Sequence, residues 1–396
     1  MPISLYLITY NCARLLHPPS SLSPHLFSAL SPLSSEPPSL VVISLQEIAP
    51  LAASFLGGSQ LTSYYATFTS AVRTATRSAF NEDYALIAYN NVGLTAIMVF
   101  ARKPTLIKSV TYAAVGLGFL SMGNKGAVGV RLTHNLPSDP SKTVTLTFVS
   151  AHLAPHEHNI SARNANWESL VKNLVFADPA GDEQSVYSPS SYLFLLGDLN
   201  YRTSSSRPGE LDYLVYPQPQ DRINDNTHYL QLFLQDQLSI ERMAGRAFQG
   251  LEEEKITFPP TYKYIISRQE NEGEYWGWSK NRWPSWTDRI LYLPADGVVV
   301  RNYTSIPQIR GSDHQVVAMH AEVPEAPVEV ELVAPWGIQE GWRGRRATAR
   351  KLEVIVGVLA WLLGGTGRGV LFALLVGAAG GWWVVRAWVQ GYRRLE

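Results

Sequence analysis

Strand-length apolar runs recur through residues 1–323 of this 396-residue chain. Several are unbroken enough to be buried on both faces of a sheet. They lie at residues 5–8, 40–43, 94–100, 144–149, 192–196 and 290–293. Helix-like stretches, such as residues 162–176 and 227–243, lie between them. Strands that alternate with helices predict a layered α/β domain with packed sheets.

Acidic and basic residues are unevenly distributed along a chain whose formal net charge is zero. Residues 341–396 hold nine of the 33 Lys and Arg residues and two of the 33 Asp and Glu residues. Residues 1–340 therefore hold 24 basic and 31 acidic residues. Proteins dedicated to nucleic acids normally carry a basic footprint. The acidic body argues against that class and against a nucleic-acid partner.

The C-terminal part of the sequence differs from the rest. Residues 324–351 contain three prolines and then a basic run, and we interpret them as a linker. Residues 352–385 are apolar, interrupted mainly by Glu353, by glycines at 364–367 and by Arg368. Such a stretch could be a core helix, but two glycine-rich apolar runs between arginines are poorly suited to a core. We therefore expect residues 352–396 to attach the chain to a membrane.

Two membrane arrangements fit this segment. Residues 370–389 are long enough for a single tail anchor, since a span needs about 20 residues. A hairpin that enters at Leu352 and turns at residues 364–369 would leave both basic flanks on the cytosolic side, as the positive-inside rule expects. Each arm of such a hairpin is short for a full span. We favour the tail anchor slightly.

Polar residues stand at the ends of the apolar runs. Strand ends lie at the rim of a sheet, so these side chains can converge on one pocket. Each of them alone would be an ordinary turn, cap or surface residue, and their joint occurrence in this order carries the argument. The set comprises Asn11, Glu47, His152, Asp198, Asn200, Asp288, Asp313 and His314.

These residue types suit the metal-dependent hydrolysis of a phosphate ester. A carboxylate holds a hard divalent cation such as Mg²⁺, which prefers oxygen ligands. The cation neutralises the charge that develops on the phosphate. A second carboxylate orients and deprotonates the attacking water. Amide and imidazole groups donate to the phosphate oxygens, and a further Asp fixes one histidine.

The motifs around these residues resemble those of the inositol polyphosphate 5-phosphatases, within the endonuclease/exonuclease/phosphatase superfamily. The resemblance runs from Thr9 to about Val323, and its most specific motifs are Gly-Asp-Leu-Asn-Tyr-Arg at 197–202 and Pro-Ser-Trp-Thr-Asp-Arg-Ile-Leu at 284–291. The family usually has Cys at the position of Thr287. The other motifs are Ser-Leu-Gln-Glu at 44–47, Gly-Asn-Lys-Gly-Ala-Val at 123–128, Ala-His-Leu at 151–153, Phe-Pro-Pro-Thr-Tyr-Lys-Tyr at 258–264 and Ser-Asp-His at 312–314.

The resemblance implies a four-layer α/β sandwich with two mixed sheets, and residues 1–323 as the catalytic domain. It implies Glu47 as the main Mg²⁺ ligand with Asn11 beside the metal, and Asp198 as the base on the water. Asn200, His152 and His314 would bind the reacting phosphate, Asp288 would orient His314, and Asp313 would lie on the metal side. Substrate contacts would come from Lys125, Arg163, Asn164, Tyr262, Lys263, Lys280 and Arg282.

An inositol ring with several phosphates needs more cations than one scissile phosphate, and Lys263, Lys280 and Arg282 supply them within an acidic body. The expected reaction is the Mg²⁺-dependent conversion of phosphatidylinositol 4,5-bisphosphate to phosphatidylinositol 4-phosphate. A tail anchor would place the catalytic domain on the cytosolic face of a membrane, which we expect to be the endoplasmic reticulum. The alternatives are a nuclease of the same superfamily and an inactive membrane scaffold.

Overall fold

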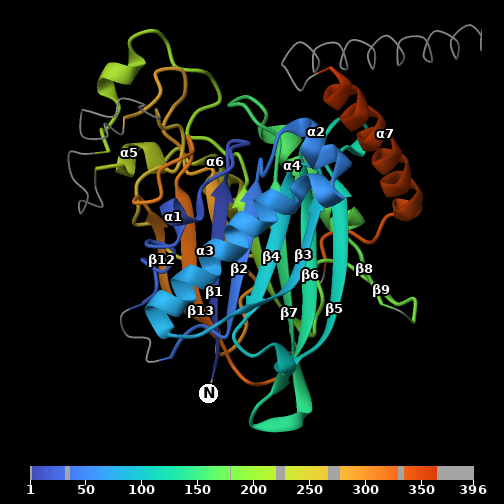
Figure 1. Cartoon of the computed structure of the whole chain (residues 1–396). Coiled ribbons are helices and arrows are strands. Elements are labelled where there is room, and N and C mark those ends of the chain that lie inside the picture. The colour runs from blue at the N-terminus through green and yellow to red at the C-terminus, as the bar shows by residue number, and fades with distance from the viewer. Residues whose placement is uncertain are drawn as a thin grey trace, which may run out of the picture.

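Two mixed β-sheets dominate the computed structural model, which describes residues 2–31, 36–178, 180–219, 228–265, 277–328 and 334–363 (Figure 1). A short ribbon of β8 (Phe176–Ala177) and β9 (Glu183–Gln184) lies beside them. The first sheet has the order β12 (Val299–Ile306), β13 (Val316–Val323), β1 (Ile3–Asn11), β2 (Leu40–Gln46), β4 (Thr95–Ala101) and β3 (Ala85–Val92). The second has the order β11 (Asp288–Tyr292), β10 (Ser191–Asp198), β7 (Asp139–His152), β6 (Gly126–Leu136) and β5 (Ile107–Gly116).

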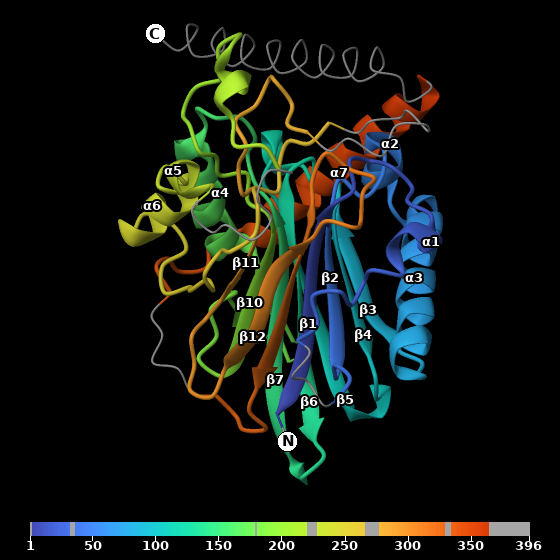
Figure 2. The same cartoon turned by 90° about the vertical axis from the view of Figure 1, so that its left-hand side faces the viewer.

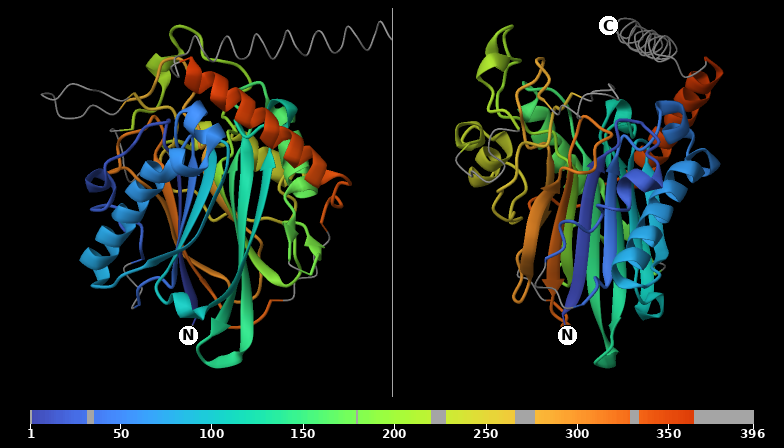
Figure 3. Two further views of the ribbon diagram at one scale, coloured as in Figure 1. Left: turned by 45° about the vertical axis from the view of Figure 1, so that its right-hand side comes forward. Right: turned by 60° about the vertical axis from the view of Figure 1, so that its left-hand side comes forward.

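The two sheets pack face to face, and helices cover their outer faces (Figures 2 and 3). Successive side chains of β1 alternate, so that Leu5 and Leu7 lie in the core between the sheets, while Tyr6 and Ile8 lie under the helices. On the first sheet these helices are α1 (Pro19–Leu22) and α3 (Thr62–Phe80), and on the second they are α4 (Ile160–Asn173) and α6 (Gln237–Met243). The predicted α/β sandwich is confirmed. Burial on both faces explains why the strands are continuously apolar.

Each sheet contains one parallel pair, and these pairs place the polar strand ends together. β1 runs parallel to β2 with Asn11 opposite Gln46, and β7 runs parallel to β10 with His152 opposite Asp198. Parallel strands end at the same edge of a sheet. The carboxyl ends of all four strands therefore lie at the end of the molecule opposite the N-terminus (Figure 1).

The C-terminal boundaries differ from the prediction. Helix α7 (Trp342–Leu362) includes residues 342–351, which we assigned to the linker, and residues 352–362, which we assigned to the membrane segment. It packs against α2 (Leu51–Leu56), and its side chain Glu353 is fully buried there. The linker prediction is thus wrong from residue 342 onward. The prolines that suggested it all precede the helix.

No helix among the described residues is both long and apolar enough to cross a bilayer. The hairpin interpretation does not match the structure, because its first arm would begin at Leu352, inside α7. The tail anchor was predicted at residues 370–389, which lie outside the described residues. The anchor therefore stays a prediction.

Candidate active site

A polar cleft of about 400 Å³ lies where the carboxyl ends of the parallel strands meet. It brings together side chains from both sheets and from the loops before β11 and β13. The sequence-predicted residues that line it are Asn11, Glu47, Lys125, His152, Asp198, Asn200, Tyr262, Lys263, Asp313 and His314. The convergence expected from the strand ends is therefore seen in the structure.

Asp198 is the central acceptor of the cleft. Its Oδ2 accepts a hydrogen bond from Asn11 Nδ2 at 2.9 Å and lies 3.2 Å from His152 Nε2. Its Oδ1 accepts from the backbone N–H of Asn200 at 3.1 Å. Burial alone would raise the pKa of Asp198, but the contact with His152 and the charges of His314 and Lys125 hold that pKa well below its usual range. Asp198 is therefore ionised at neutral pH and can orient a water.

Asp288 and His314 form a buried pair on the other side of Asp198. His314 Nδ1 donates to Asp288 Oδ2 at 2.9 Å, and the same oxygen accepts from Thr261 Oγ1 at 2.7 Å and Thr287 Oγ1 at 2.8 Å. Burial opposes the charged imidazole, but Asp288, Asp198 and Asp313 together raise the pKa of His314 to about 10. His314 is thus an imidazolium, with its other ring nitrogen available to an anion.

Lys125 lies against His152 and near Glu47. Its Nζ is 2.5 Å from His152 Nε2 and 3.7 Å from Glu47 Oε1. Burial lowers the pKa of His152, and the charge of Lys125 lowers it further. Burial also lowers the pKa of Lys125 itself. His152 is therefore neutral, in contrast to His314.

Glu47 follows the last residue of β2 and has a left-handed backbone conformation with φ 47°. Such a φ is strained for a residue with a side chain, and strain of this kind gathers at functional sites. Arg14 Nε donates to Glu47 Oε2 at 2.9 Å. Burial opposes ionisation, but His152, Lys125 and Arg14 lower the pKa of Glu47 overall. An ionised carboxylate is thus held at the cleft.

The oxygen atoms on this side of the cleft suit a hard divalent cation. Glu47, Asp313 and Asn11 line the cleft and offer two carboxylates and an amide oxygen, the last of which also accepts from the backbone N–H of Ala13 at 3.1 Å. Asp313 is paired with Lys263, and its pKa is lowered, because the charges of His314 and Lys263 outweigh burial. Asp198, Asp288 and His314 form a separate buried cluster whose ligand atoms lie within 4.8 Å of one another. The candidate cation site adjoins this cluster, because Asn11 also donates to Asp198.

Asn200 and Arg202 act together at the turn after β10. Asn200 has φ 60°, and its Nδ2 donates to Leu153 O at 3.1 Å, while its Oδ1 accepts from Arg202. Both ends of this amide are thus engaged, and in this structure Asn200 stabilises the turn. The Arg202 guanidinium lies 4.4 Å from the centroid of the Tyr262 ring, and its Nη1 has no partner among the described residues. A free donor beside the cleft suits a phosphate oxygen.

Arg202 and Arg14 were missed by the sequence prediction. Arg202 is the last residue of the motif at 197–202, so its place in the motif was the available signal. Arg14 had none beyond its closeness to Asn11. Both line the cleft and add positive charge to it.

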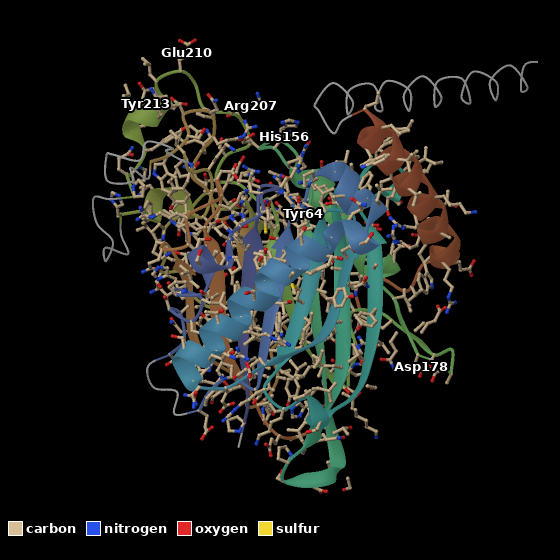
Figure 4. The ribbon with its side chains drawn as sticks, in the orientation of Figure 1. Tyr64, His156, Asp178, Arg207, Glu210 and Tyr213 are labelled. Carbon is tan, nitrogen blue, oxygen red and sulfur yellow. The ribbon has the colours of Figure 1, made fainter. Side chains whose placement is uncertain are left out.

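Lys280 and Arg282 lie outside the residues that line the cleft. Lys280 Nζ lies 4.0 Å from the centroid of the Tyr213 ring, and Figure 4 shows Tyr213 at the same end of the molecule as His156 and Arg207. Arg282 Nε lies 3.5 Å from Glu157 Oε1. These cations therefore lie outside the lining of the cleft, Lys280 over the Tyr213 ring and Arg282 beside Glu157.

Arg163 and Asn164 are not brought into the cleft. Arg163 is fully buried, and it donates to the backbone oxygens of residues 154, 156 and 157 and to Gln237 Oε1. Asn164 donates to Glu241 and accepts from Tyr201. In this structure Arg163 holds the loop after β7, and Asn164 joins Tyr201 to Glu241 of α6, so the polar atoms of both are used inside the fold. The predicted substrate contacts are corrected accordingly.

A family model described as "Endonuclease/Exonuclease/phosphatase family 2" matches residues 8–320. The chain belongs to this family. The match covers every residue of the cleft and ends before α7. The family match and the cleft thus concern the same part of the chain.

Curated relatives include the polyphosphatidylinositol phosphatase INP53 of Saccharomyces cerevisiae, 30% identical over 71% of this chain and 23% of its own length. Another is the type IV inositol polyphosphate 5-phosphatase 11 of Arabidopsis thaliana, 29% identical over 58% of each chain. The chain thus spans between about a quarter and three-fifths of the length of these relatives.

Solved structures share the fold. The inositol polyphosphate 5-phosphatase domain of a synaptojanin, in complex with inositol (1,4)-bisphosphate and calcium ion, matches with a TM-score of 0.63 and 24% identity, covering 89% of this chain and 90% of that one. A Cimex nitrophorin, solved as a ferrous NO complex, matches with a TM-score of 0.50 and 16% identity, covering 83% and 99%. One fold thus serves two chemistries, so function has to be argued from the site.

Proposed function

We propose that this chain hydrolyses the 5-phosphate of an inositol phosphate or phosphoinositide. One observation carries the proposal: an ionised Asp198 lies between a neutral His152 and a protonated His314, beside an ionised Glu47. The names of the curated relatives support the substrate class.

Each residue has a defined task in this reaction. Asp198 orients the attacking water and accepts its proton as the oxygen–phosphorus bond forms. His314 donates to a non-bridging phosphate oxygen as the bond to the inositol oxygen breaks, and the inositol oxygen leaves as an alkoxide that takes up a proton from solvent water. Arg202 and Lys125 add further donors. Glu47, with Asn11 and Asp313, would hold a divalent cation, which when bound neutralises charge on the phosphate.

We further propose Mg²⁺ as the cation and phosphatidylinositol 4,5-bisphosphate as the substrate. Mg²⁺ suits a site of few carboxylates and an amide. Lys263 lines the cleft and supplies a cation beyond those around the reacting phosphate, and Lys280 and Arg282, which lie outside the lining, are proposed to serve the same second phosphate. A second phosphate on the ring would meet these groups. The predicted C-terminal anchor, on the endoplasmic reticulum, would place the cleft at the membrane that holds the lipid.

Phosphate release from a panel of substrates tests the proposal. The panel contains phosphatidylinositol 4,5-bisphosphate, phosphatidylinositol 5-phosphate, soluble inositol polyphosphates and DNA, each with Mg²⁺ or a chelator. We expect Mg²⁺-dependent release from the inositol compounds alone. Cleavage of DNA would indicate the nuclease alternative, and inactivity on every substrate would indicate a scaffold.

Arg282→Ala tests the finer choice of substrate. Remote binding energy can be used for positioning at the reacting centre, so losing this cation should affect the 4,5-bisphosphate more than the 5-monophosphate. One charged hydrogen bond is worth about 1.5–3 kcal/mol, so the preference should narrow roughly ten- to hundredfold. Arg207→Ala, on the same end of the molecule (Figure 4), is the control. Equal losses on both lipids would remove the support for a 4-phosphate contact.

A further inference from the structure

Helix α7 lies beyond the part of the chain that matches the family, yet it contacts the loop that carries Lys125. Figures 1 and 3 show α7 lying against α2. The buried face of α7 consists of Ala349, Glu353, Gly357 and Ala360. Three of these four are small and apolar or lack a side chain, as close helix packing requires. The carboxylate among them needs a separate explanation, because a buried charge is costly unless it is paired.

Glu353 contacts arginines of its own helix and the loop that carries Lys125. Its Oε1 accepts from Arg346 Nη1 at 2.7 Å and from the backbone N–H of Gly123 at 2.9 Å. Its Oε2 lies 3.3 Å from Arg350 Nη1. The two arginines neutralise the carboxylate, and the carboxylate fixes an amide of a loop 230 residues earlier.

The loop around Gly123 is held on its other sides by backbone bonds. Leu117 N–H donates to Lys125 O at 2.7 Å, and Leu94 N–H donates to Gly123 O at 2.9 Å. Gly123 packs directly on Gly93, because a Cβ atom added at Gly123 would lie 2.6 Å from the Gly93 nitrogen. Glu353 therefore adds a restraint on Gly123 through its backbone N–H. Two residues further on, Lys125 reaches His152 and Glu47.

The same helix also restrains the segment after Glu47. Arg350 Nη2 donates to Leu56 O at 2.8 Å, and Arg350 Nη1 donates to Phe55 O, which satisfies carbonyl groups at the end of α2. A side chain at Gly357 would lie 3.1 Å from Phe55 Cβ, so the helices are in close contact. α7 thus holds two segments that lead from residues of the cleft.

We propose that Glu353 is a positioning residue, which acts through Gly123 to hold Lys125 in the cleft. Helix α7 is then part of the active site's support rather than a spacer before the C-terminal segment. The inference rests on the proposed function for its kinetic test. The loop restraint can also be measured without any substrate.

The kinetic test compares variants of the full chain on a soluble inositol polyphosphate, which removes effects of membrane binding. Glu353→Ala should lower kcat/KM roughly ten- to hundredfold, the scale of a displaced catalytic group. Glu353→Gln keeps an oxygen that can accept from Gly123 and should recover most of the activity. Arg346→Ala is the matched control, because it breaks an ion pair of Glu353 but leaves the bond to Gly123.

A double-mutant cycle shows whether the effect passes through Lys125. In a Lys125→Ala background, Glu353→Ala should cost no more than about twofold, because residues that act as one unit are non-additive. Full additivity of the two losses would overturn the proposal, since it would mean that Glu353 supports the fold alone. Wild-type activity in Glu353→Ala would overturn it as well.

Hydrogen exchange separates this inference from the proposed function. The amides of residues 117–125 should exchange faster in Glu353→Ala than in the wild type, and Glu353→Gln should restore their protection. Unchanged exchange would overturn the positioning role. If the wild-type protein released no phosphate, the proposed function would fail while this measurement still decided the role of Glu353. Should Glu353→Ala fail to fold, Glu353→Asp, whose shorter side chain stretches the same bond, replaces it in both tests.

Discussion

Two histidine–carboxylate pairs share the cleft, and their protonation states are opposite. His314 lies 2.9 Å from Asp288, and His152 lies 3.2 Å from Asp198. Both pairs are buried, so burial does not distinguish them. The difference comes from their neighbours: carboxylates surround His314 and raise its pKa to about 10, whereas Lys125 beside His152 adds to the effect of burial and lowers its pKa.

This difference gives the two histidines different chemistry. A protonated His314 contributes a charge to the phosphate, while a neutral His152 contributes one N–H and one lone pair. Asp198 lies between them, and the contact with His152, followed by the charges of His314 and Lys125, keeps its pKa low against the effect of burial. Its low pKa keeps Asp198 ionised, so that it can orient the water and accept its proton. The paired Asp288 thus keeps His314 charged, whereas Lys125 helps to keep His152 neutral.

Asp198→Asn should have the largest effect, because it removes the acceptor common to both sides. Asn keeps the size of the side chain but cannot accept the proton of the water. Turnover should fall by the roughly 10²–10⁴-fold typical of losing an acid–base group. The control is Asp178→Asn, an exposed position that Figure 4 shows on the flank of the molecule, away from the cleft. Near-normal turnover in folded Asp198→Asn would end the assignment.

Asp288→Asn should make His314 resemble His152. Without the Asp288 charge the pKa of His314 falls from about 10, so the charged donor is lost at neutral pH. We expect a loss on the order of 10²-fold at pH 8, partly recovered at low pH where His314 is again protonated. The check is the pH profile of kcat/KM, whose descending limb should move to lower pH. An unchanged profile would contradict a charged His314.

Stability should show the same linkage. His314 has a raised pKa in the folded state, so its contribution is complete below the unfolded pKa of about 6.5 and is lost as the pH rises through about 10. The difference in melting temperature between wild type and Asp288→Asn should therefore be large near pH 6 and narrow towards pH 10. A difference that is constant across this range would point to packing rather than charge.

The sequence predicted the cleft because strand direction and side-chain chemistry are local features. Polar residues at the ends of Leu5–Ile8 and of the run at 192–196 had to meet once those strands lay in parallel pairs. The protonation states could not be predicted in the same way. Lys125 is 27 residues from His152 in the chain, and their contact depends on the hairpin of β6 and β7.

Two errors have similar causes. The helix expected at residues 227–243 is divided into α5 (Leu230–Phe233) and α6, because Asp236 caps α6 by accepting from Ser239 N–H and pairs with the buried Arg289. Glu353 was read as an interruption of an apolar membrane segment. Its contact with Gly123 lies 230 residues away in sequence, so no local pattern could reveal it.

Lys125→Met should reduce the difference in pKa between the two histidines by raising the pKa of His152. Burial would still lower the pKa of His152, but the charge of Lys125 would no longer lower it further. The pKa of His152 should therefore rise. Imidazole signals followed by NMR against pH would show the shift, with His152→Gln for assignment. Lys263→Met is the control, because Lys263 also lines the cleft but pairs with Asp313 rather than with His152. Activity should fall about ten- to hundredfold, the worth of one charged hydrogen bond.

If the pKa of His152 stayed unchanged in Lys125→Met, burial alone would explain its neutrality. The contrast between the two histidines would then come from the carboxylates around His314. If Lys263→Met shifted the pKa of His152 equally, the effect would be a general one of net charge in the cleft.

Thr287 offers the smallest and most selective change. Its hydroxyl donates to Asp288 Oδ2, which Thr261 and His314 also contact, so Thr287→Val removes one of three donors from that oxygen. The remaining two keep Asp288 in place, and a hydrogen bond to a charged group contributes about 1.5 kcal/mol at the low end, so activity should fall only about tenfold. Thr287→Cys keeps a weak donor of similar size and should lose less activity.

Thr261→Val should cost more activity than Thr287→Val, because Thr261 Oγ1 also accepts from the backbone N–H of Asp288 at 3.2 Å. Steady-state kinetics at pH 7 on one soluble substrate would rank the three variants. The reverse order would mean that Thr287, rather than Thr261, fixes the carboxylate that keeps His314 charged.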